Sequence, residues 1–237
     1  LAATLRALSA GLPTEQVRIA QNFPDPTLWY YYTGPVEHIV LPPAAQDVAG
    51  AQISVEQLAA AGVQRIILPL QAAPQWDDQA IAANALAARY SKVFEQTVGV
   101  WPVQIYALPP VNLMPINATF RNGITLVGVA WQPLTLTPGG LLTVHLQWQG
   151  AAQKLTGSEK VFLQLLTAAG QLVAQDDRSL DLTVAPAIYG ILIPANLPTG
   201  DYRLIAGLYD PDQAGMPRVL TLDGADAVGV GEMLLAR

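Results

Sequence analysis

The pattern of apolar residues changes at one proline-rich stretch, LPPVNLMP, at 108–115. Before it, short apolar runs alternate with segments of helical spacing. After it, the helical spacing disappears and apolar and polar residues alternate as they do in half-buried strands. A proline-rich stretch between two such patterns is typical of a domain boundary. We therefore predict an α+β chain of two domains, 1–110 and 111–237, each near the common domain size of about 100–150 residues.

The first domain is predicted to be a small α/β domain with a mostly parallel sheet. Strand-like runs at 17–21, 38–42 and 64–70 are separated by predicted helices, and this order is typical of parallel strands joined by helical crossovers. Two further runs, at 92–97 and 102–108, flank a turn and predict a closing hairpin.

Four helices are predicted in this domain, the first over 1–11. The second begins with Asp25 as N-cap and Pro26 as first helical residue, a pair that suits a helix start. Gly34 is predicted to close it in the left-handed conformation.

The third helix is predicted over 54–62, with Ser54 and Gln57 at the spacing of a capping box and Gly62 as its stop. The fourth is predicted over 77–90, with acidic residues at its start and Arg89 near its end, as the helix dipole favours.

The second domain is predicted to be an antiparallel β-sandwich, immunoglobulin-like or jelly-roll-like. In TVHLQW, Val144, Leu146 and Trp148 share one face of a strand, while His145 lies on the opposite, polar face and is expected to be solvated. A glycine-rich run at 227–232 is interpreted as a strand with bulges, because no βαβ unit surrounds it. The other strand-like runs lie at 123–131, 141–148, 160–167, 171–177, 187–193, 202–209 and 217–222.

Charge and composition exclude several classes of partner. The net charge is −6, shared equally by 1–110 and 111–237, so there is no basic stripe for a nucleic acid. Cysteine is absent, which excludes disulfides and thiolate chemistry. Charged residues make up only 13%, against a usual share of about 25%, which leaves two interpretations open: a partner-covered surface, or a surface of neutral polar residues.

No catalytic constellation is predicted, and neither a metal nor a cofactor is expected. The only histidines are His38 and His145, and a metal site needs several converging ligands. The stretch DPDQAG at 210–215 lacks the later ligands of a calcium loop and is interpreted as an ordinary turn. Asp176 and Asp177 are neighbours on a predicted strand, so they point to opposite faces and cannot act together.

Aromatic residues gather in QNFPDPTLWYYYTG, at 21–34, in a chain with only 17 aromatics. Three interpretations remain open: core packing, a platform for stacking sugars, or a seam against a part of the protein outside this chain. Trp76 and Trp101 each lie beside a turn and can join the same surface. The candidate binding residues are Trp29, Tyr30, Tyr31, Tyr32, Trp76 and Trp101.

Several phrases resemble one known family. They are VRIAQNFPDPTLWYYYTG, HIVLPP, AGVQRIILPL with the downstream Trp76, VGVWPVQIYALPP, TPGGLLTVHLQW, KVFLQLLTAAGQLVAQDD, LPTGDYRLIAGLYDP and RVL. Together they cover nearly the whole chain. They are similar to the C-terminal extracytoplasmic soluble region of bacterial polytopic membrane glycosyltransferases related to dolichyl-phosphate-mannose–protein mannosyltransferases.

This resemblance implies a non-catalytic tail outside the cytoplasmic membrane, which positions an acceptor or a glycan. Its partner is then the membrane-embedded portion of the same polypeptide, which holds the family's catalytic acids and its lipid-linked sugar-donor site. No catalytic residue is carried over to this chain. The chain begins at Leu1 rather than Met, and we expect it to be part of a longer protein. Two alternatives remain: a free-standing carbohydrate-binding module, or a hydrolase that uses scattered carboxylates.

Overall fold

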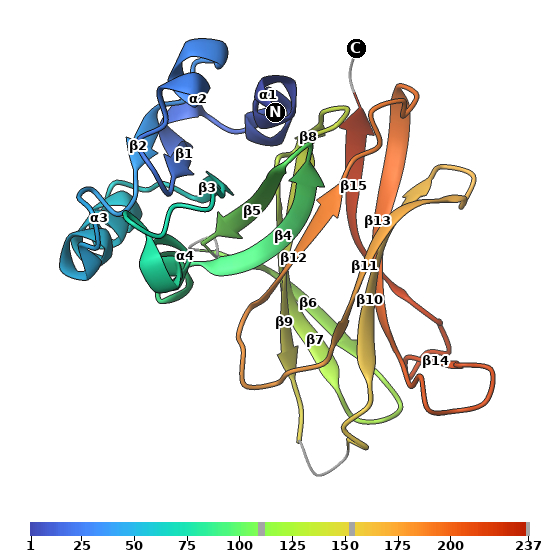
Figure 1. Cartoon of the computed structure of the whole chain (residues 1–237). Helices are drawn as coiled ribbons and strands as arrows, with labels where there is room; N and C mark the ends of the chain where they lie inside the picture. Colours follow the sequence, from blue (N-terminus) through green and yellow to red (C-terminus); the bar gives the residue numbers. More distant parts are fainter. Residues whose placement is uncertain (109–111, 152–154, 236–237) are drawn as a thin grey trace. The chain divides into compact units, whose positions relative to one another are not determined.

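The computed structural model describes residues 1–108, 112–151 and 155–235 (Figure 1). The chain divides into two compact units. Unit 1 comprises Leu1–Pro109 and Gly139–Leu141, and unit 2 comprises Pro110–Pro138 and Leu142–Arg237. The predicted boundary between residues 110 and 111 lies outside the described residues.

Unit 1 contains a mixed five-stranded sheet in the order β2-β1-β3-β5-β4. Strand β1 pairs in parallel with β2 and β3, whereas β5 pairs antiparallel with both β3 and β4. The predicted closing hairpin is confirmed, and because it places β5 antiparallel between β3 and β4, the sheet is mixed rather than mostly parallel. The strands are β1 (Val17–Gln21), β2 (His38–Val40), β3 (Arg65–Pro69), β4 (Ser91–Val98) and β5 (Trp101–Ala107).

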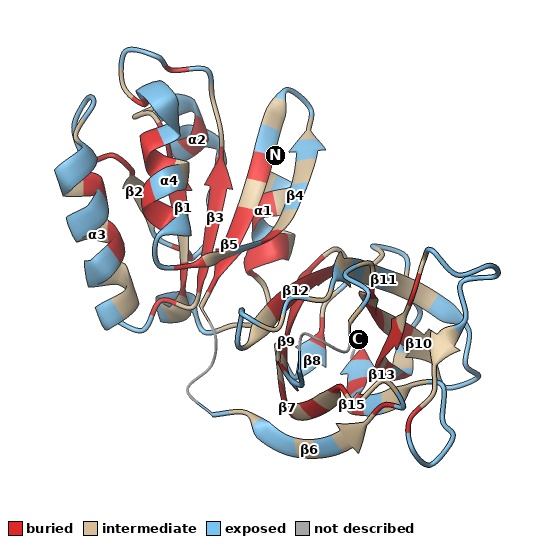
Figure 2. Cartoon of the chain, turned by 90° about the horizontal axis from the view of Figure 1, so that it is seen from below, coloured by how far each residue is buried: buried red, intermediate tan, exposed pale blue. Residues whose placement is uncertain are grey.

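Helices lie on both faces of this sheet (Figure 2). On one face, helices α3 and α4 bury their apolar residues in a cluster with Ile66 and Leu68 of β3. The side chain of Arg65 alternates to the other face, where it is fully buried and donates to the main-chain oxygen of Leu8, 2.8 Å away, near the end of α1. The helices are α1 (Ala2–Ser9), α2 (Pro26–Tyr31), α3 (Val48–Ala60) and α4 (Ile81–Ala87), with 3-10 turns at Thr14–Gln16 and Asp78–Ala80.

The start of α2 is confirmed, but its predicted end is wrong. The Asp25 carboxylate accepts from the main-chain nitrogen of Thr27 at 2.7 Å, and Pro26 opens the helix. The chain leaves the helix at Tyr32 in an extended conformation, and Gly34 does not adopt a positive φ. A Cβ atom at Gly34 would lie 2.3 Å from the Tyr32 ring, so the glycine makes room for that ring rather than for a left-handed cap.

The start of α3 lies earlier than predicted. Asp47 is the N-cap, and its carboxylate accepts from the main-chain nitrogen of Gly50 at 2.8 Å. Ser54 lies inside the helix and donates to the main-chain oxygen of Gly50 instead. The stop at Gly62 is confirmed, because this glycine has a φ of +80°.

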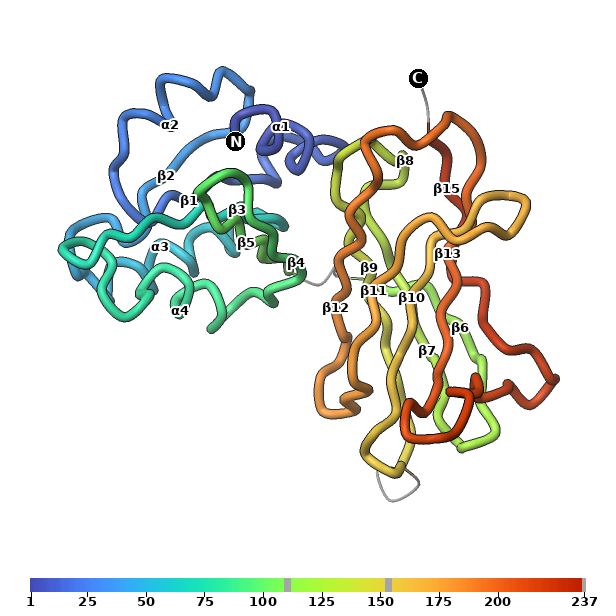
Figure 3. The backbone as a smooth tube through the Cα atoms, turned by 45° about the vertical axis from the view of Figure 1, so that its right-hand side comes forward, coloured from blue at the N-terminus to red at the C-terminus, as the bar shows by residue number. Residues whose placement is uncertain are grey.

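Unit 2 contains two sheets, and its hairpins can be followed in Figure 3. The larger has the order β11-β10-β13-β15-β8 with β14 added to β13, and the smaller has the order β12-β9-β7-β6. The pairs among β10, β11, β13, β14 and β15 are antiparallel, as are β6–β7 and β7–β9, whereas β15 and β8 pair in parallel. The strands are β6 (Met114–Thr119), β7 (Thr125–Gln132), β8 (Thr135–Leu136), β9 (Leu141–Gln149), β10 (Lys160–Thr167), β11 (Leu172–Ser179), β12 (Ala187–Leu192), β13 (Gly200–Tyr209), β14 (Arg218–Val219) and β15 (Val228–Leu235).

Both sheets of unit 2 contribute to one hydrophobic core. Val144, Leu146 and Trp148 of β9 enter it together with alternate residues of β10 and β13, as the period of two predicts. The expectation that His145 is solvated is wrong, because its side chain is fully buried. Alternation along a strand identifies the face of a residue but not whether that face is covered. The glycine-rich run forms the start of β15, and a register shift opposite Leu204 and Ile205 confirms a bulge there.

Candidate functional site

The carboxyl ends of the parallel strands in unit 1 form a switch point. The chain passes from β1 to β2 on one side, and then crosses β1 to enter β3 on its other side. The segments that follow β1 and β3 therefore leave the sheet in opposite directions. In open α/β sheets, this is where ligands usually bind.

A network of buried polar side chains ties these segments together. The Asn22 side-chain nitrogen donates to the main-chain oxygen of Gln71 and to the Asp77 carboxylate, both at 2.9 Å. Asp77 also accepts from the main-chain nitrogen of Ala82 at 2.9 Å, and the Gln71 side chain donates to Asp25. Burial would raise the pKa of Asp25, but the hydrogen bonds from Thr27 and Gln71 outweigh it and hold the pKa below its usual value. These groups therefore hold the loops in place.

Two adjacent hollows lie at this edge of unit 1, and Trp101 contributes to both. We call the residues that line them the carboxyl-edge site. The first hollow has a volume of about 560 Å³ and is lined by Leu70, Gln71, Ala72, Val100, Trp101 and Pro102. The second has a volume of about 230 Å³ and is lined by Leu1, Ala2, Thr27, Leu28, Tyr31 and Trp101. All of these side chains are uncharged.

The structure brings together two of the six predicted binding residues. Tyr31, which is 64% exposed, and Trp101 line the same hollow although 70 positions separate them in the sequence. Trp29 and Tyr30 are also exposed on α2 but lie outside the two hollows. The Tyr30 and Tyr31 rings meet edge to face at a centroid distance of 5.0 Å.

The other two predicted residues pack inside unit 1. The Tyr32 side chain is 6% exposed, and its ring lies 4.6 Å from the His38 ring. The Trp76 indole donates to the main-chain oxygen of Pro42 at 3.0 Å, and its ring meets Phe23 edge to face. Both therefore have structural contacts and lie outside the two hollows.

Sequence reasoning missed Gln71 and Val100 as lining residues. Gln71 follows the buried strand β3 by two positions, and the rule that ligands bind at carboxyl ends of strands could have identified it. Val100, at the turn between β4 and β5, is 88% exposed. A valine in a two-residue turn carries no signal that distinguishes binding from chance exposure.

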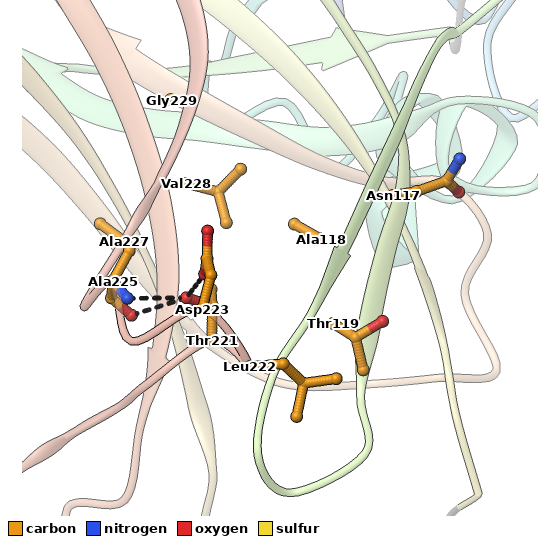
Figure 4. Close-up of a pocket in the computed structure, with 10 residues that line it drawn as sticks. All are labelled: Asn117, Ala118, Thr119, Thr221, Leu222, Asp223, Ala225, Ala227, Val228 and Gly229. Atoms are coloured by element: carbon orange, nitrogen blue, oxygen red, sulfur yellow. Dashed lines mark hydrogen bonds between the residues drawn. The ribbon is translucent and has the colours of Figure 1, made fainter.

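Unit 2 holds a separate groove of about 490 Å³, shown in Figure 4. One wall is the edge of β6, the other is the start of β15, and a turn at 221–225 lies at one end. Within this turn the Thr221 hydroxyl donates to the Asp223 carboxylate, which lowers the pKa of Asp223. The groove is lined by Asn117, Ala118, Thr119, Thr221, Leu222, Asp223, Ala225, Ala227, Val228 and Gly229.

Several carboxylates elsewhere in unit 2 have local partners. Asp176 pairs with Arg178 at 2.7 Å, whereas Asp177 accepts from the Tyr209 hydroxyl at 3.2 Å. Asp210 accepts from the Ser158 hydroxyl at 2.7 Å and from the main-chain nitrogen of Asp212 at 3.0 Å, which makes DPDQAG a turn held by its own first residue. Across 1–108, 112–151 and 155–235, no group of three or more potential metal ligands converges.

Comparisons with known proteins identify no family. No protein-family model matches the chain, and no curated protein matches it. Among solved structures, the C-terminal domain of wzt is 13% identical over 53% of this chain and 81% of that chain, with a TM-score of 0.32. Two glucuronidases also match, from Bifidobacterium dentium (16% identity, 56% of this chain, 19% of that chain, TM-score 0.29) and Ruminococcus gnavus (17%, 55%, 17%, 0.22). This chain thus spans less than a fifth of either glucuronidase.

Likeness at this level assigns neither a fold family nor a function to the chain. Within the described residues, every helix falls short of the length and apolar character that a membrane crossing requires.

Proposed function

We propose that this chain is a non-catalytic region that binds neutral carbohydrate at the carboxyl-edge site. The proposal rests on one observation: Tyr31 and Trp101 line the same apolar hollow. Trp101 also lines the adjacent hollow, together with Gln71. A large flat ring with an amide nearby suits a sugar, whose ring has an apolar face and a rim of hydroxyl groups.

The charge of the site favours a neutral ligand. Every side chain that lines the two hollows is uncharged. The nearest acid of the network, Asp25, accepts hydrogen bonds from Thr27 and Gln71. A sugar without carboxylate or phosphate groups therefore meets no charge that it must neutralise.

We also propose a setting for this region: the extracytoplasmic tail of a membrane glycosyltransferase-like protein, where it positions a glycan or acceptor for the membrane-embedded portion of the same polypeptide. The sequence phrases that resemble such tails support this setting. In this proposal unit 2 is a β-sandwich of the immunoglobulin-like or jelly-roll-like kind. Its two sheets around one core support that assignment.

Titration of the protein with neutral oligosaccharides, followed by tryptophan fluorescence and calorimetry, tests the binding. We expect Trp101→Ala and Tyr31→Ala each to weaken binding about five- to thirtyfold, since one stacked ring contributes roughly 1–2 kcal/mol. Trp29→Ala is the matched control, because Trp29 is exposed on the same helix but lies outside the hollows. Binding that is absent at millimolar sugar, or equally sensitive to Trp29→Ala, would contradict the proposal.

Fractionation of cells that express the full-length gene tests the setting separately. We expect an antibody against this region to detect the protein in the membrane pellet, accessible from outside the cytoplasm. A full-length protein found only in the soluble fraction, and still able to bind sugar, would instead support the alternative of a free-standing carbohydrate-binding module.

A further inference from the structure

The outer edge of β15 is paired over only a small part of its length. On its inner side β15 pairs with β13 from Val228 to Leu235. On its outer side, within the described residues, the ladder with β8 covers only Leu234 and Leu235. Alternate residues of an antiparallel strand direct their N–H and C=O groups away from the neighbouring strand. From Val228 to Glu232, β15 therefore directs main-chain groups toward the neighbouring strand position. Strand β8 fills that position only beside Leu234 and Leu235.

A second strand edge forms the opposite wall. Strand β6 is the last strand of the smaller sheet, so one side of its main chain is also unpaired. At one end the gap is closed by an isolated bridge between Phe120 and Thr221, with the main-chain nitrogen of Leu222 donating to Thr119 at 2.9 Å. Figure 4 shows Ala118 and Val228 on opposite walls of the groove that remains. The strand position between β15 and β6 is thus occupied by main chain at both ends, and no described residue pairs with either edge between those ends.

These edges carry few of the features that usually prevent strand addition. Edge strands are commonly protected by charged side chains, prolines or bulges. The sequence of β6 is MPINAT, which has one proline and no charge, and residues 228–231 of β15 are uncharged, with one bulge. A Cβ atom at Gly229 would have no heavy atom within 4 Å, so the groove has free space at its wall.

One end of the groove is negatively charged. The Asp223 side chain is exposed there, and the hydroxyl of Thr221 that donates to it favours its ionised form. The neighbouring Asp226 is engaged by Arg218 at 3.0 Å. The charge that a ligand meets in the groove is therefore that of Asp223, which suits a cationic side chain.

We propose that this groove binds an extended peptide, which adds to β15 as a strand in line with β8 and brings a lysine or arginine side chain to Asp223. Main-chain hydrogen bonds to β15 supply the affinity, and the salt bridge to Asp223 sets the orientation. The small residues of both walls leave space for short alternate side chains. This proposal concerns unit 2 alone and does not depend on carbohydrate binding at the carboxyl-edge site.

The probe is a fluorescent, amidated heptapeptide of alternating valine and threonine with one terminal lysine, titrated against the whole protein by anisotropy. We expect saturable binding and slower amide hydrogen exchange at those residues from Val228 to Glu232 whose N–H groups point away from β13. The same peptide with every internal amide N-methylated keeps its side chains but has no N–H donor for a ladder on either edge. It is expected to bind at least tenfold more weakly, because its donors are removed.

Three variants locate the site. Gly229→Leu fills the groove and is expected to weaken peptide binding at least tenfold. Ser179→Leu introduces the same side chain on the far edge strand β11 and is expected to leave binding within twofold. Asp223→Asn is expected to weaken the lysine peptide several-fold while leaving a version that ends in glutamine unchanged.

The proposal is overturned if the N-methylated peptide binds as well as its parent, or if Gly229→Leu has no effect. It is also overturned if no peptide binds at millimolar concentration, or if neutral sugars occupy the groove and the peptide does not.

Discussion

The side-chain amide of Asn22 donates a hydrogen bond to the carboxylate of Asp77, 2.9 Å away and 55 positions later in the chain. Both groups are buried, with 3% and 9% of the residue exposed. Asp77 also accepts from the main-chain nitrogen of Ala82 in the first turn of α4. One amide therefore joins the end of β1 to the start of a helix that follows β3, and it supports the loops of the carboxyl-edge site.

Replacement of Asn22 by alanine is expected to lower the free energy of unfolding by about 1–3 kcal/mol, because Asp77 and the main chain of Gln71 lose buried partners. Urea unfolding measures the effect. Asn84→Ala is the control, since Asn84 is exposed on α4, and we expect a change below about 0.5 kcal/mol. Equal effects of the two changes would show that the Asn22 bridge has no special importance.

Asp47→Ala is expected to destabilise unit 1 by about 1 kcal/mol through loss of the α3 N-cap. Ser54→Ala is expected to be near neutral, because Ser54 lies inside the helix, where alanine is the better helix former. Thermal and urea unfolding compare the two variants. If Ser54→Ala were the more damaging change, α3 would begin where the capping-box pattern predicts.

Gly231→Ala is expected to lower the free energy of unfolding by about 1–2 kcal/mol, because a Cβ atom there would lie 2.9 Å from the Trp131 ring. Gly229→Ala, two positions away, meets open space and is expected to stay within about 0.5 kcal/mol. Urea unfolding and the near-ultraviolet circular dichroism of the tryptophans measure both. A Gly231→Ala protein with unchanged stability would mean that the indole moves aside freely.

Stability is expected to fall as the pH drops from 6.5 toward 4, because burial lowers the pKa of His145 from 6.5 to about 4. In this window the unfolded chain binds a proton that the folded chain excludes, so protonation favours unfolding. Between pH 6.5 and 4, protonation of His145 in the unfolded chain lowers the free energy of unfolding by about 3 kcal/mol in total. Below pH 4 this group makes the free energy of unfolding no more dependent on pH.

Urea unfolding at pH 7, 6 and 5 measures this slope, and His145→Gln is expected to flatten it, whatever its effect on stability at pH 7. The pKa of His38 is also lowered by burial, but both proteins keep that contribution. Parallel slopes in the two proteins would contradict the assignment to His145.

Much of the secondary structure could be predicted because local chemistry determines it. The runs at 17–21 and 160–167 coincide with β1 and β10, and the Asp25–Pro26 helix start forms as expected. The capping-box pattern at Ser54 failed because Asp47, seven positions earlier, offers a carboxylate to the same helix. A capping motif indicates where a helix can begin, but a competing cap upstream decides where it does.

The candidate site could be predicted only in part. The sequence indicates an aromatic surface, but six rings were candidates and only Tyr31 and Trp101 line a common hollow. Which rings point outward depends on the packing of Tyr32 over Gly34 and of Trp76 on Phe23. Those contacts join separate segments, and no local pattern contains them. The burial of His145 was missed for the same reason.

The place of β5 in the sheet bears on when unit 1 can assemble during synthesis. The strand that lies between β3 and β4 is the last of the five in chain order. A nascent chain that has emerged only as far as β4 must leave the outer edge of β3 bare, with apolar residues that the finished protein buries. Unit 1 therefore reaches its native arrangement only after residue 107 is available, and until then that bare edge is a natural binding point for a chaperone.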